Sequence, residues 1–317
     1  MPLAVGPAIS QMRGAMSELS TIPTVLTIVG ANPDAYAEAV SRVERLLSIS
    51  HSALGPLACD FLLPAEEKVQ AKARLMGFPG EGTSLSDLAV DFAFQAAENR
   101  RKRLLIADMD STIINVECLD ELADFAGVKA QVSEITERAR RGELAFEGAL
   151  RERVGMLKGL SVDALQSCYD ERVKLNPGAR TLVTTMAKHG ARCALVSGGF
   201  TFFTSRVAEA AGFHLNRANT LIEHEGVLTG QVGDPILGKE AKLAALREET
   251  AALGLTPADA LAVGDGANDL AMIEAAGLGV AYRAKPIVAA EADAKVDHTD
   301  LTTLLYFQGY KAEEFVQ

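Results

Sequence analysis

Acidic side chains gather where two apolar segments end. The segment LLIAD (104–108) ends in one acid and is followed two residues later by another, and the segment ALAVGDG (260–266) opens the turn GDGAND. The residues concerned are Asp108, Asp110, Asp265, Asn268 and Asp269. Carboxylates packed together repel one another and lose hydration, so such a group calls for a cation. Oxygen ligands favour Mg²⁺, which keeps some waters and bridges to phosphate.

A third apolar segment, CALVSGG (193–199), ends in a hydroxyl and two glycines, namely Ser197, Gly198 and Gly199. Glycines let backbone amides approach an anion closely, and a helix expected to begin near residue 200 points its positive end the same way. A cation follows on the next helical pattern, from either Lys239 or Lys242.

These segments and a fourth, LGVAY (278–282), are apolar throughout and are separated by helical patterns. Such a pattern is typical of parallel strands covered by helices on both faces, so we predict an α/β fold. Ligands bind such sheets at the carboxyl ends of the strands, where the polar groups stand. The expected helices cover 178–190, 200–212, 239–254 and 269–277. Asn268 and Asp269 border the start of the last one, so N-capping is an alternative role for both.

An insert over about 116–175 separates the first two of these strands, and its Glu, Arg, Ala and Leu content predicts a helical cap. The stretch 219–234 alternates apolar and polar residues around "EG", which predicts a hairpin. A last helix is expected within 301–317.

Residues 1–97 have a different pattern from the rest of the chain, with strands and helices alternating. The expected strands are 24–30, 58–64 and 87–95, and the expected helices are 34–49 and 66–78. We predict a small α+β domain over 1–97 and an α/β domain over 98–317.

Composition excludes several classes of protein. The 317 residues are 48% hydrophobic and 23% charged, as in a folded globular protein. A net charge of -11 argues against nucleic-acid binding, and no apolar run reaches the length of a membrane span. The four cysteines are scattered, and the N-terminus lacks the order of a secretory signal, so a cytoplasmic location is expected.

The order D-x-D-S-T, S-G-G-F, lysine, G-D-G-A-N-D resembles the haloacid dehalogenase (HAD) superfamily of phosphatases. Within the cap, Glu117 and the segment RGELAFEGALRERVGMLKGL (141–160) resemble the phosphoserine phosphatases. Residues 1–97 resemble the ACT-like domain that precedes the catalytic part in longer bacterial members. The resemblance covers most of residues 104–286, and it implies a Rossmann-like parallel sheet with an inserted helical cap.

The resemblance implies different roles for the two acids of the first motif. Asp108 is the expected nucleophile, which forms an aspartyl-phosphate. Asp110 is expected to protonate the leaving serine oxygen and then to activate the water that hydrolyses the intermediate. Mg²⁺ would be held by Asp108, the backbone carbonyl of Asp110, and Asp265.

The remaining motif residues are expected to support the phosphoryl group. Ser197 and Lys242 would bind its oxygens. The family's spacing selects Lys242 as this lysine and leaves Lys239 as a solvated surface lysine. Asn268 and Asp269 would orient the waters of the metal and the lysine.

Substrate choice is expected in the cap. Glu117 would pair with the ammonium of phosphoserine and Arg153 with its carboxylate, while Phe146 would cover the site. Taken singly, each has an ordinary alternative as a surface Glu, a surface Arg or a core Phe. Two positions depart from the family pattern: Arg140 stands where methionine is usual, and Arg283 where many relatives have histidine.

The predicted function is therefore Mg²⁺-dependent hydrolysis of O-phosphoserine to serine and phosphate, the last step of serine biosynthesis. The nearest alternative is a HAD phosphatase or phosphotransferase acting on another small phosphomonoester. Two other classes remain open. One is a phosphoaccepting signalling domain, and the other is an amino-acid-binding regulator, which only residues 1–97 suggest. The expected partner is a small-molecule substrate, with no nucleic acid and no membrane, and a homodimer is left open.

Overall fold

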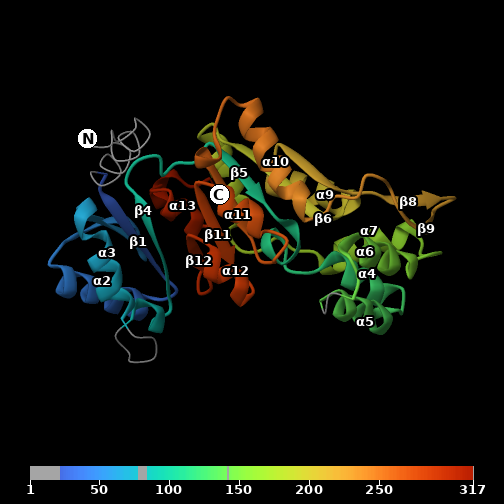
Figure 1. Cartoon of the computed structure of the whole chain (residues 1–317), viewed down its shortest axis with the longest axis horizontal. Helices are drawn as coiled ribbons and strands as arrows, with labels where there is room; N and C mark the ends of the chain where they lie inside the picture. The colour runs from blue at the N-terminus through green and yellow to red at the C-terminus, as the bar shows by residue number, and fades with distance from the viewer. Residues whose placement is uncertain (1–21, 78–83, 141–142, 317) are drawn as a thin grey trace, which may run out of the picture. The chain divides into compact units, whose positions relative to one another are not determined.

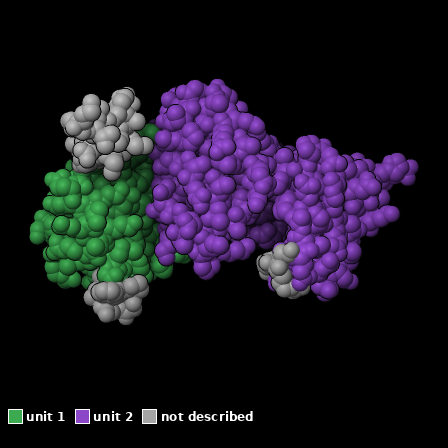
Figure 2. Space-filling model, viewed as in Figure 1, with its two compact units in different colours: residues 1–101, 296–299, 303–314 green, residues 102–295, 300–302, 315–317 purple. Residues whose placement is uncertain are grey.

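The computed structural model describes residues 22–77, 84–140 and 143–316, and the side chain of Arg140 lies outside the described part (Figure 1). The chain divides into two compact units (Figure 2). The first contains the residues up to Arg101 with Val296–Thr299 and Thr303–Glu314, and the second contains Lys102–Lys295 with Asp300–Thr302 and the residues from Phe315. The predicted division into domains 1–97 and 98–317 stays a prediction.

The first unit is built on an antiparallel sheet with the strand order β2-β3-β1-β4. Three of its strands were expected from the sequence, and so were both of its main helices. The elements are β1 (Thr24–Gly30), α2 (Pro33–Leu47), β2 (His51–Gly55), β3 (Ala58–Leu63), α3 (Lys68–Met76) and β4 (Val90–Ala96). The missed strand, β2, lies at the edge of the sheet and exposes most of its side chains, so it lacks an apolar signal.

Strand β1 is buried along its whole length, because both faces of the sheet are covered within the first unit. On one face Leu26 and Ile28 join Phe61 in a core cluster with residues of α2 and α3. The short helix α13 (Thr303–Phe307), the expected last helix, packs against β1 and β4. The first unit is therefore completed by residues that follow the second unit in the sequence.

The second unit contains a six-stranded sheet with the order β12-β11-β10-β5-β6-β7. The four predicted strands are confirmed as its central members, and they pair in parallel: β5 (Leu104–Ala107), β6 (Arg192–Phe200), β10 (Ala260–Gly264) and β11 (Leu278–Tyr282). The two outer strands, β7 (Leu215–Asn219) and β12 (Ala294–Val296), were missed because they are short and partly polar.

Helices cover both faces of this sheet, as the apolar strands predict. Leu104 and Ile106 of β5 pack in one cluster with Leu246 and Met272, which lie on α10 (Lys239–Ala252) and α11 (Leu270–Ala275). The alternate residue Leu105 is also fully buried, and α8 (Ala179–Lys188) and α9 (Thr201–Ala211) pack against β6. A further helix, α12 (Pro286–Glu291), packs against α11 and β11. The predicted α/β fold is thereby confirmed.

The insert forms the predicted helical cap, with four helices: α4 (Cys118–Phe125), α5 (Lys129–Arg140), α6 (Phe146–Gly155) and α7 (Val162–Arg172). The predicted hairpin consists of β8 (Leu221–His224) and β9 (Val227–Val232). Figure 1 shows this hairpin beside the cap helices, and the N–H of Gly159 donates to the carbonyl of Leu228 at 2.8 Å. The hairpin is therefore tied to the cap by backbone hydrogen bonds.

No helix in the described ranges combines the length and apolar character that crossing a membrane requires. The four cysteines are buried and free, as expected for scattered thiols.

Candidate active site

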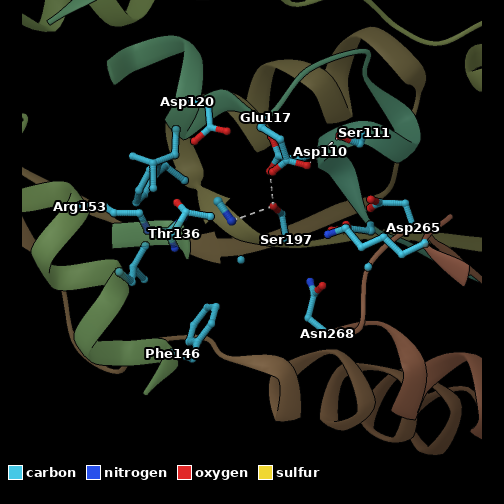
Figure 3. Close-up of a pocket in the computed structure, with 18 residues that line it drawn as sticks. Asp110, Ser111, Glu117, Asp120, Thr136, Phe146, Arg153, Ser197, Asp265 and Asn268 are labelled. Atoms are coloured by element: carbon cyan, nitrogen blue, oxygen red, sulfur yellow. Dashed lines mark hydrogen bonds between the residues drawn. The ribbon is translucent and has the colours of Figure 1, made fainter. Parts of the chain in front are cut away.

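Most of the polar groups predicted to act together line one cavity of about 420 Å³ in the second unit. Lys242 and Asp269 do not line it, but Lys242 contacts Asp108, which does. Strands β10, β5 and β6 are neighbours in a parallel arrangement, so their carboxyl ends meet on the same side of the sheet. The core and the cap both contribute to the lining, which includes Asp108, Asp110, Glu117, Phe146, Arg153, Ser197, Gly198, Gly199, Asp265 and Asn268. Figure 3 shows the labelled members of this set around the cavity.

A buried lysine lies between two carboxylates at the core end of the cavity. The ammonium of Lys242 is 2.6 Å from the Oδ1 atom of Asp108 and donates to the Oδ1 atom of Asp269 at 2.5 Å. The three residues are 2%, 5% and 0% exposed, respectively. Burial alone would lower the pKa of Lys242, but the two carboxylates outweigh it and raise that pKa. The lysine therefore stays charged and fixes both acids.

The pKa of Asp108 is raised well above its ordinary value by burial and by the charge of Asp269, whereas Lys242 acts to lower it. Ionisation of Asp108 thus depends on neighbouring cations, because the protein interior disfavours an isolated carboxylate. Asp269 is held from a second side, since the N–H of Gly266 donates to its Oδ2 atom at 3.0 Å. A side chain at Gly264 is excluded, because its Cβ would lie 2.3 Å from the Cγ atom of Asp269.

Asp110 lies in the turn that follows β5 and has a different set of partners. The N–H of Cys118, the first residue of α4, donates to its Oδ1 atom at 2.9 Å, and the hydroxyl of Ser197 donates to its Oδ2 atom at 3.1 Å. Burial and the charge of Glu117 raise the pKa of Asp110 to about 6. A carboxyl group with a pKa near neutrality can both release and accept a proton.

The end of β6 is irregular, and this irregularity shapes the wall of the cavity. Val196 pairs with Arg217 and Phe200 with Asn219, so residues 197–199 bulge out from the pairing with β7. The N–H of Gly199 donates to the hydroxyl of Ser197 at 2.8 Å. A Cβ at Gly199 would lie 2.9 Å from the Oδ2 atom of Asp110, so only glycine fits beside that carboxylate.

Three carboxylates could hold a metal ion at this end of the cavity. Single oxygens of Asp108, Asp265 and Asp269 all lie within 4.8 Å of one another. Burial and nearby acids raise the pKa of Asp265 to about 6, which indicates a surplus of negative charge that a cation would relieve. The oxygen-only set fits a hard divalent ion. The carboxylate of Asp110 is not part of this cluster, so of this residue only the backbone carbonyl remains for the predicted ligand role.

The cap supplies the opposite wall of the cavity. Glu117, which precedes α4, accepts a hydrogen bond from the hydroxyl of Ser111 at 2.7 Å. Phe146, at the start of α6, is 40% exposed, and its ring lies 3.6 Å from the position of a Cβ on Gly198. Arg153 is partly buried on α6, and its Nε atom donates to the carbonyl of Ala149 at 3.2 Å. The three predicted cap residues thus face the same cavity as the core acids.

Two alternatives from the sequence can be judged on geometry. Lys239 is exposed and lies 3.8 Å from Glu240, whereas Lys242 enters the site. The carboxylate of Asp269 does not cap α11. It accepts no hydrogen bond from an N–H of that helix, and its two oxygens instead bind Lys242 and the N–H of Gly266.

Arg283, one of the two departures from the family pattern, has a φ of 45°. Its Cζ atom lies 5.3 Å from the centre of the Tyr282 ring.

Several cavity residues had no role in the sequence prediction, and among them are Ser111, Asp120 and Lys285. Ser111 stands inside the D-x-D-S-T motif and adopts a φ of 55°, which is uncommon for a residue with a side chain. Asp120 follows Glu117 by three positions, a spacing that brings two helical residues to one face. Lys285 follows β11 and could have been found as a cation beyond the end of a predicted strand.

The haloacid dehalogenase-like hydrolase family matches residues 105–274, which is more than half of the chain. The phosphoserine phosphatase of Polaromonas sp. JS666 is 47% identical over 208 residues, which cover 64% of this chain and 88% of that protein. The phosphoserine phosphatase of Streptococcus thermophilus is 45% identical over 200 residues, which cover 63% and 93% of the two chains.

Solved structures that are similar to this chain also include phosphoserine phosphatases. A probable phosphoserine phosphatase from Vibrio cholerae superposes with a TM-score of 0.73 at 31% identity, covering 92% of this chain and 87% of that one. A substrate-bound phosphoserine phosphatase complex superposes with a TM-score of 0.61 at 37% identity, covering 65% of this chain and 98% of that one.

Proposed function

Because this chain belongs to the haloacid dehalogenase-like hydrolases, and within them to the phosphoserine phosphatases, we propose that it hydrolyses O-phosphoserine to serine and phosphate. The observation that carries the proposal is the composition of one cavity. Asp108, in contact with the buried Lys242, lies at its core end, and Arg153 and Glu117 lie on its cap wall. These groups suit a phosphate at one end of a small molecule and an amino-acid head group at the other.

In the first step, a carboxylate oxygen of Asp108 attacks the phosphorus atom while the bond from phosphorus to the serine oxygen breaks. Asp110 gives its proton to that oxygen, so serine leaves as an alcohol. Lys242 contributes positive charge beside the nucleophile, and Ser197 and the N–H of Gly198 supply donors for phosphoryl oxygens. The N–H of Gly199 holds the hydroxyl of Ser197 in place.

In the second step, the carboxylate of Asp110 takes a proton from water as the water oxygen attacks the phosphorus atom. The bond to Asp108 breaks, phosphate forms, and Asp110 is protonated again for the next cycle. A pKa of about 6 supports this double role, because both protonation states are populated near neutral pH.

We propose Mg²⁺ as the metal, held by Asp108, the backbone carbonyl of Asp110, and Asp265. When bound, it would neutralise charge on the phosphoryl oxygens. Asp269 and Asn268 would support this end of the site, since Asp269 already holds Lys242 and the N–H of Gly266.

The cap residues are proposed to recognise serine. The guanidinium of Arg153 suits the carboxylate of the substrate, and Glu117, held by Ser111, suits its ammonium. Phe146 covers the cavity beside Gly198 and reduces access of bulk water.

The proposal is tested by measuring phosphate release from phosphorylated amino acids and sugars, with and without Mg²⁺. O-phosphoserine is expected to give the highest kcat/KM, and chelation of metal should remove the activity. A higher kcat/KM for another phosphomonoester would replace the assigned substrate while leaving the phosphatase chemistry intact. Transfer of phosphate to an added alcohol would instead favour a phosphotransferase.

Three further features stay predictions from the sequence. They are a cytoplasmic location, a homodimer, and an ACT-like nature of residues 1–97. The order strand, helix, two strands, helix, strand in the described part of that region supports the last of them. Calorimetric titration of the full chain with serine would test whether the region binds an amino acid.

A further inference from the structure

We propose that Asp120 is a specificity-determining residue, whose carboxylate joins that of Glu117 in binding the α-ammonium of the substrate and disfavours anionic substrates that lack one. The inference deepens the proposed function and rests on it. It concerns a residue for which the sequence predicted no role.

Asp120 and Glu117 stand on the same side of the cavity. Glu117 precedes the first residue of α4, and Asp120 follows three positions later, where its N–H donates to the carbonyl of Glu117 at 3.1 Å. Both side chains line the cavity, and Figure 3 shows them on its upper side, with Arg153 entering from another element. Two carboxylates from one helical turn therefore face the space where a ligand would lie.

Arg153 provides the opposite charge on this wall. Within the described residues, no carboxylate forms an ion pair with its guanidinium, and its one hydrogen bond, from Nε to Ala149, is made within α6. Burial lowers the pKa of Arg153, and the acids that oppose this are Asp120 first and Glu117 second. Asp120 and Glu117 both act on the charge of Arg153, although neither forms a direct pair with it within the described residues.

The other acids of α4 have partners on the protein. Glu121 lies 3.2 Å from Arg172, and Asp124 lies 3.7 Å from Arg172 and 3.9 Å from Lys129. For the ranges that the structure describes, Asp120 takes part in no such pair. Its charge is therefore directed at the cavity, whereas the charges of Glu121 and Asp124 are used in the cap.

This arrangement of charges complements an α-amino acid head group. Such a group carries a carboxylate and an ammonium on one carbon, so a guanidinium beside carboxylates matches both at once. A substrate that has the carboxylate but no ammonium could still pair with Arg153. The carboxylates of Asp120 and Glu117 would then face its negative charge without a cation between them. Specificity then depends on a repulsive contact as well as on an attractive one.

The test compares two substrates that differ only in the amino group: O-phospho-L-serine and 3-phosphooxypropanoate. In the full chain, Asp120→Asn should lower kcat/KM for O-phosphoserine about 10-fold, mainly through KM, because one charged contact to the ammonium is lost. For 3-phosphooxypropanoate, kcat/KM should be unchanged or higher. Asp120→Glu, which keeps the charge, should retain most of the discrimination.

Asp124→Asn is the matched control, since it removes an acid from the same helix outside the cavity, and it should leave the ratio of the two kcat/KM values unchanged. Equal loss for both substrates in Asp120→Asn, with thermal stability intact, would overturn the inference in favour of a role in supporting Arg153 alone. The inference would also be overturned if Asp120→Asn left both kcat/KM values, and so their ratio, unchanged. Failure of the proposed function would look different, because the unmodified chain would then show no preference for O-phosphoserine.

Discussion

At the core end of the cavity, Asp108, Lys242 and Asp269 are almost completely buried, and each is held by contacts of 3.0 Å or less. At the cap end, Phe146 is 40% exposed and Arg153 is only partly buried, with a hydrogen bond to its own helix. The groups proposed to act on phosphorus are therefore fixed before a ligand arrives. The groups proposed to recognise serine keep their binding atoms available.

This difference has an energetic consequence. A buried charge that loses its partner is strongly destabilising, whereas a partly exposed arginine without an ion pair contributes little to folding. Substitutions at the core end should therefore change both activity and stability. Substitutions at the cap end should change the kinetics of the substrate and leave stability almost untouched.

The largest effect is expected from Asp108→Asn. The amide cannot form the acyl phosphate, so kcat/KM for O-phosphoserine should fall by about 10⁴-fold or more. Phosphate release measured at high enzyme concentration checks this result. Retention of more than about a tenth of the activity would remove Asp108 from the role of nucleophile.

Lys242→Met tests whether the core end couples activity to stability. The change keeps an unbranched side chain that is one atom shorter, but it leaves Asp108 and Asp269 close together without a cation. We therefore expect a loss of about 3 kcal/mol in the free energy of unfolding. Activity should fall by about 10³-fold. Denaturant unfolding and phosphate release measure the two effects, and the exposed Lys239→Met is the control expected to change neither.

Arg153→Ala tests the cap end. Loss of the charged contact to the substrate carboxylate should raise KM for O-phosphoserine by about 10- to 100-fold, with a small change in kcat. Thermal stability should stay near that of the unmodified chain. Arg151→Ala is the control on the same helix, since Arg151 pairs with Asp234 at 2.6 Å and does not line the cavity. Equal kinetics for the two variants would contradict the proposed recognition.

The smallest effect is expected from Phe146→Ala. The ring covers the cavity without fixing a reacting group, so kcat/KM should fall only about 3- to 10-fold, with stability preserved. Steady-state kinetics check this value. A loss as large as that of Lys242→Met would show that the cap end is as critical as the core end.

The sequence predicted the parts of the molecule that carry an apolar or motif signal. The four central strands of the parallel sheet are continuous apolar segments, and the acids follow them directly, so both could be found. The edge strands β2, β7 and β12 carry exposed or polar side chains, because only part of each is covered by the core. Their existence therefore depends on tertiary pairing, which a pattern along the chain does not contain.

Within the site, the sequence indicated which residues meet but not how they are held. The position of Lys242 between Asp108 and Asp269 follows from the packing of α10 against the sheet. Asp120 was missed because an acid in the first turn of a helix is ordinarily explained by the helix dipole. Along the sequence, Asp120 and Glu121 look alike. In the structure, Asp120 lines the cavity, whereas Glu121 pairs with Arg172.

Trapping the intermediate shows whether Asp108 carries the phosphoryl group. The enzyme is mixed with O-phosphoserine, quenched in acid within a turnover, and treated with borohydride, which reduces an aspartyl-phosphate to homoserine. Peptide mass spectrometry should find homoserine at position 108 and none in the Asp108→Asn variant. Active enzyme that yields no homoserine, or yields it at another aspartate, would contradict the account.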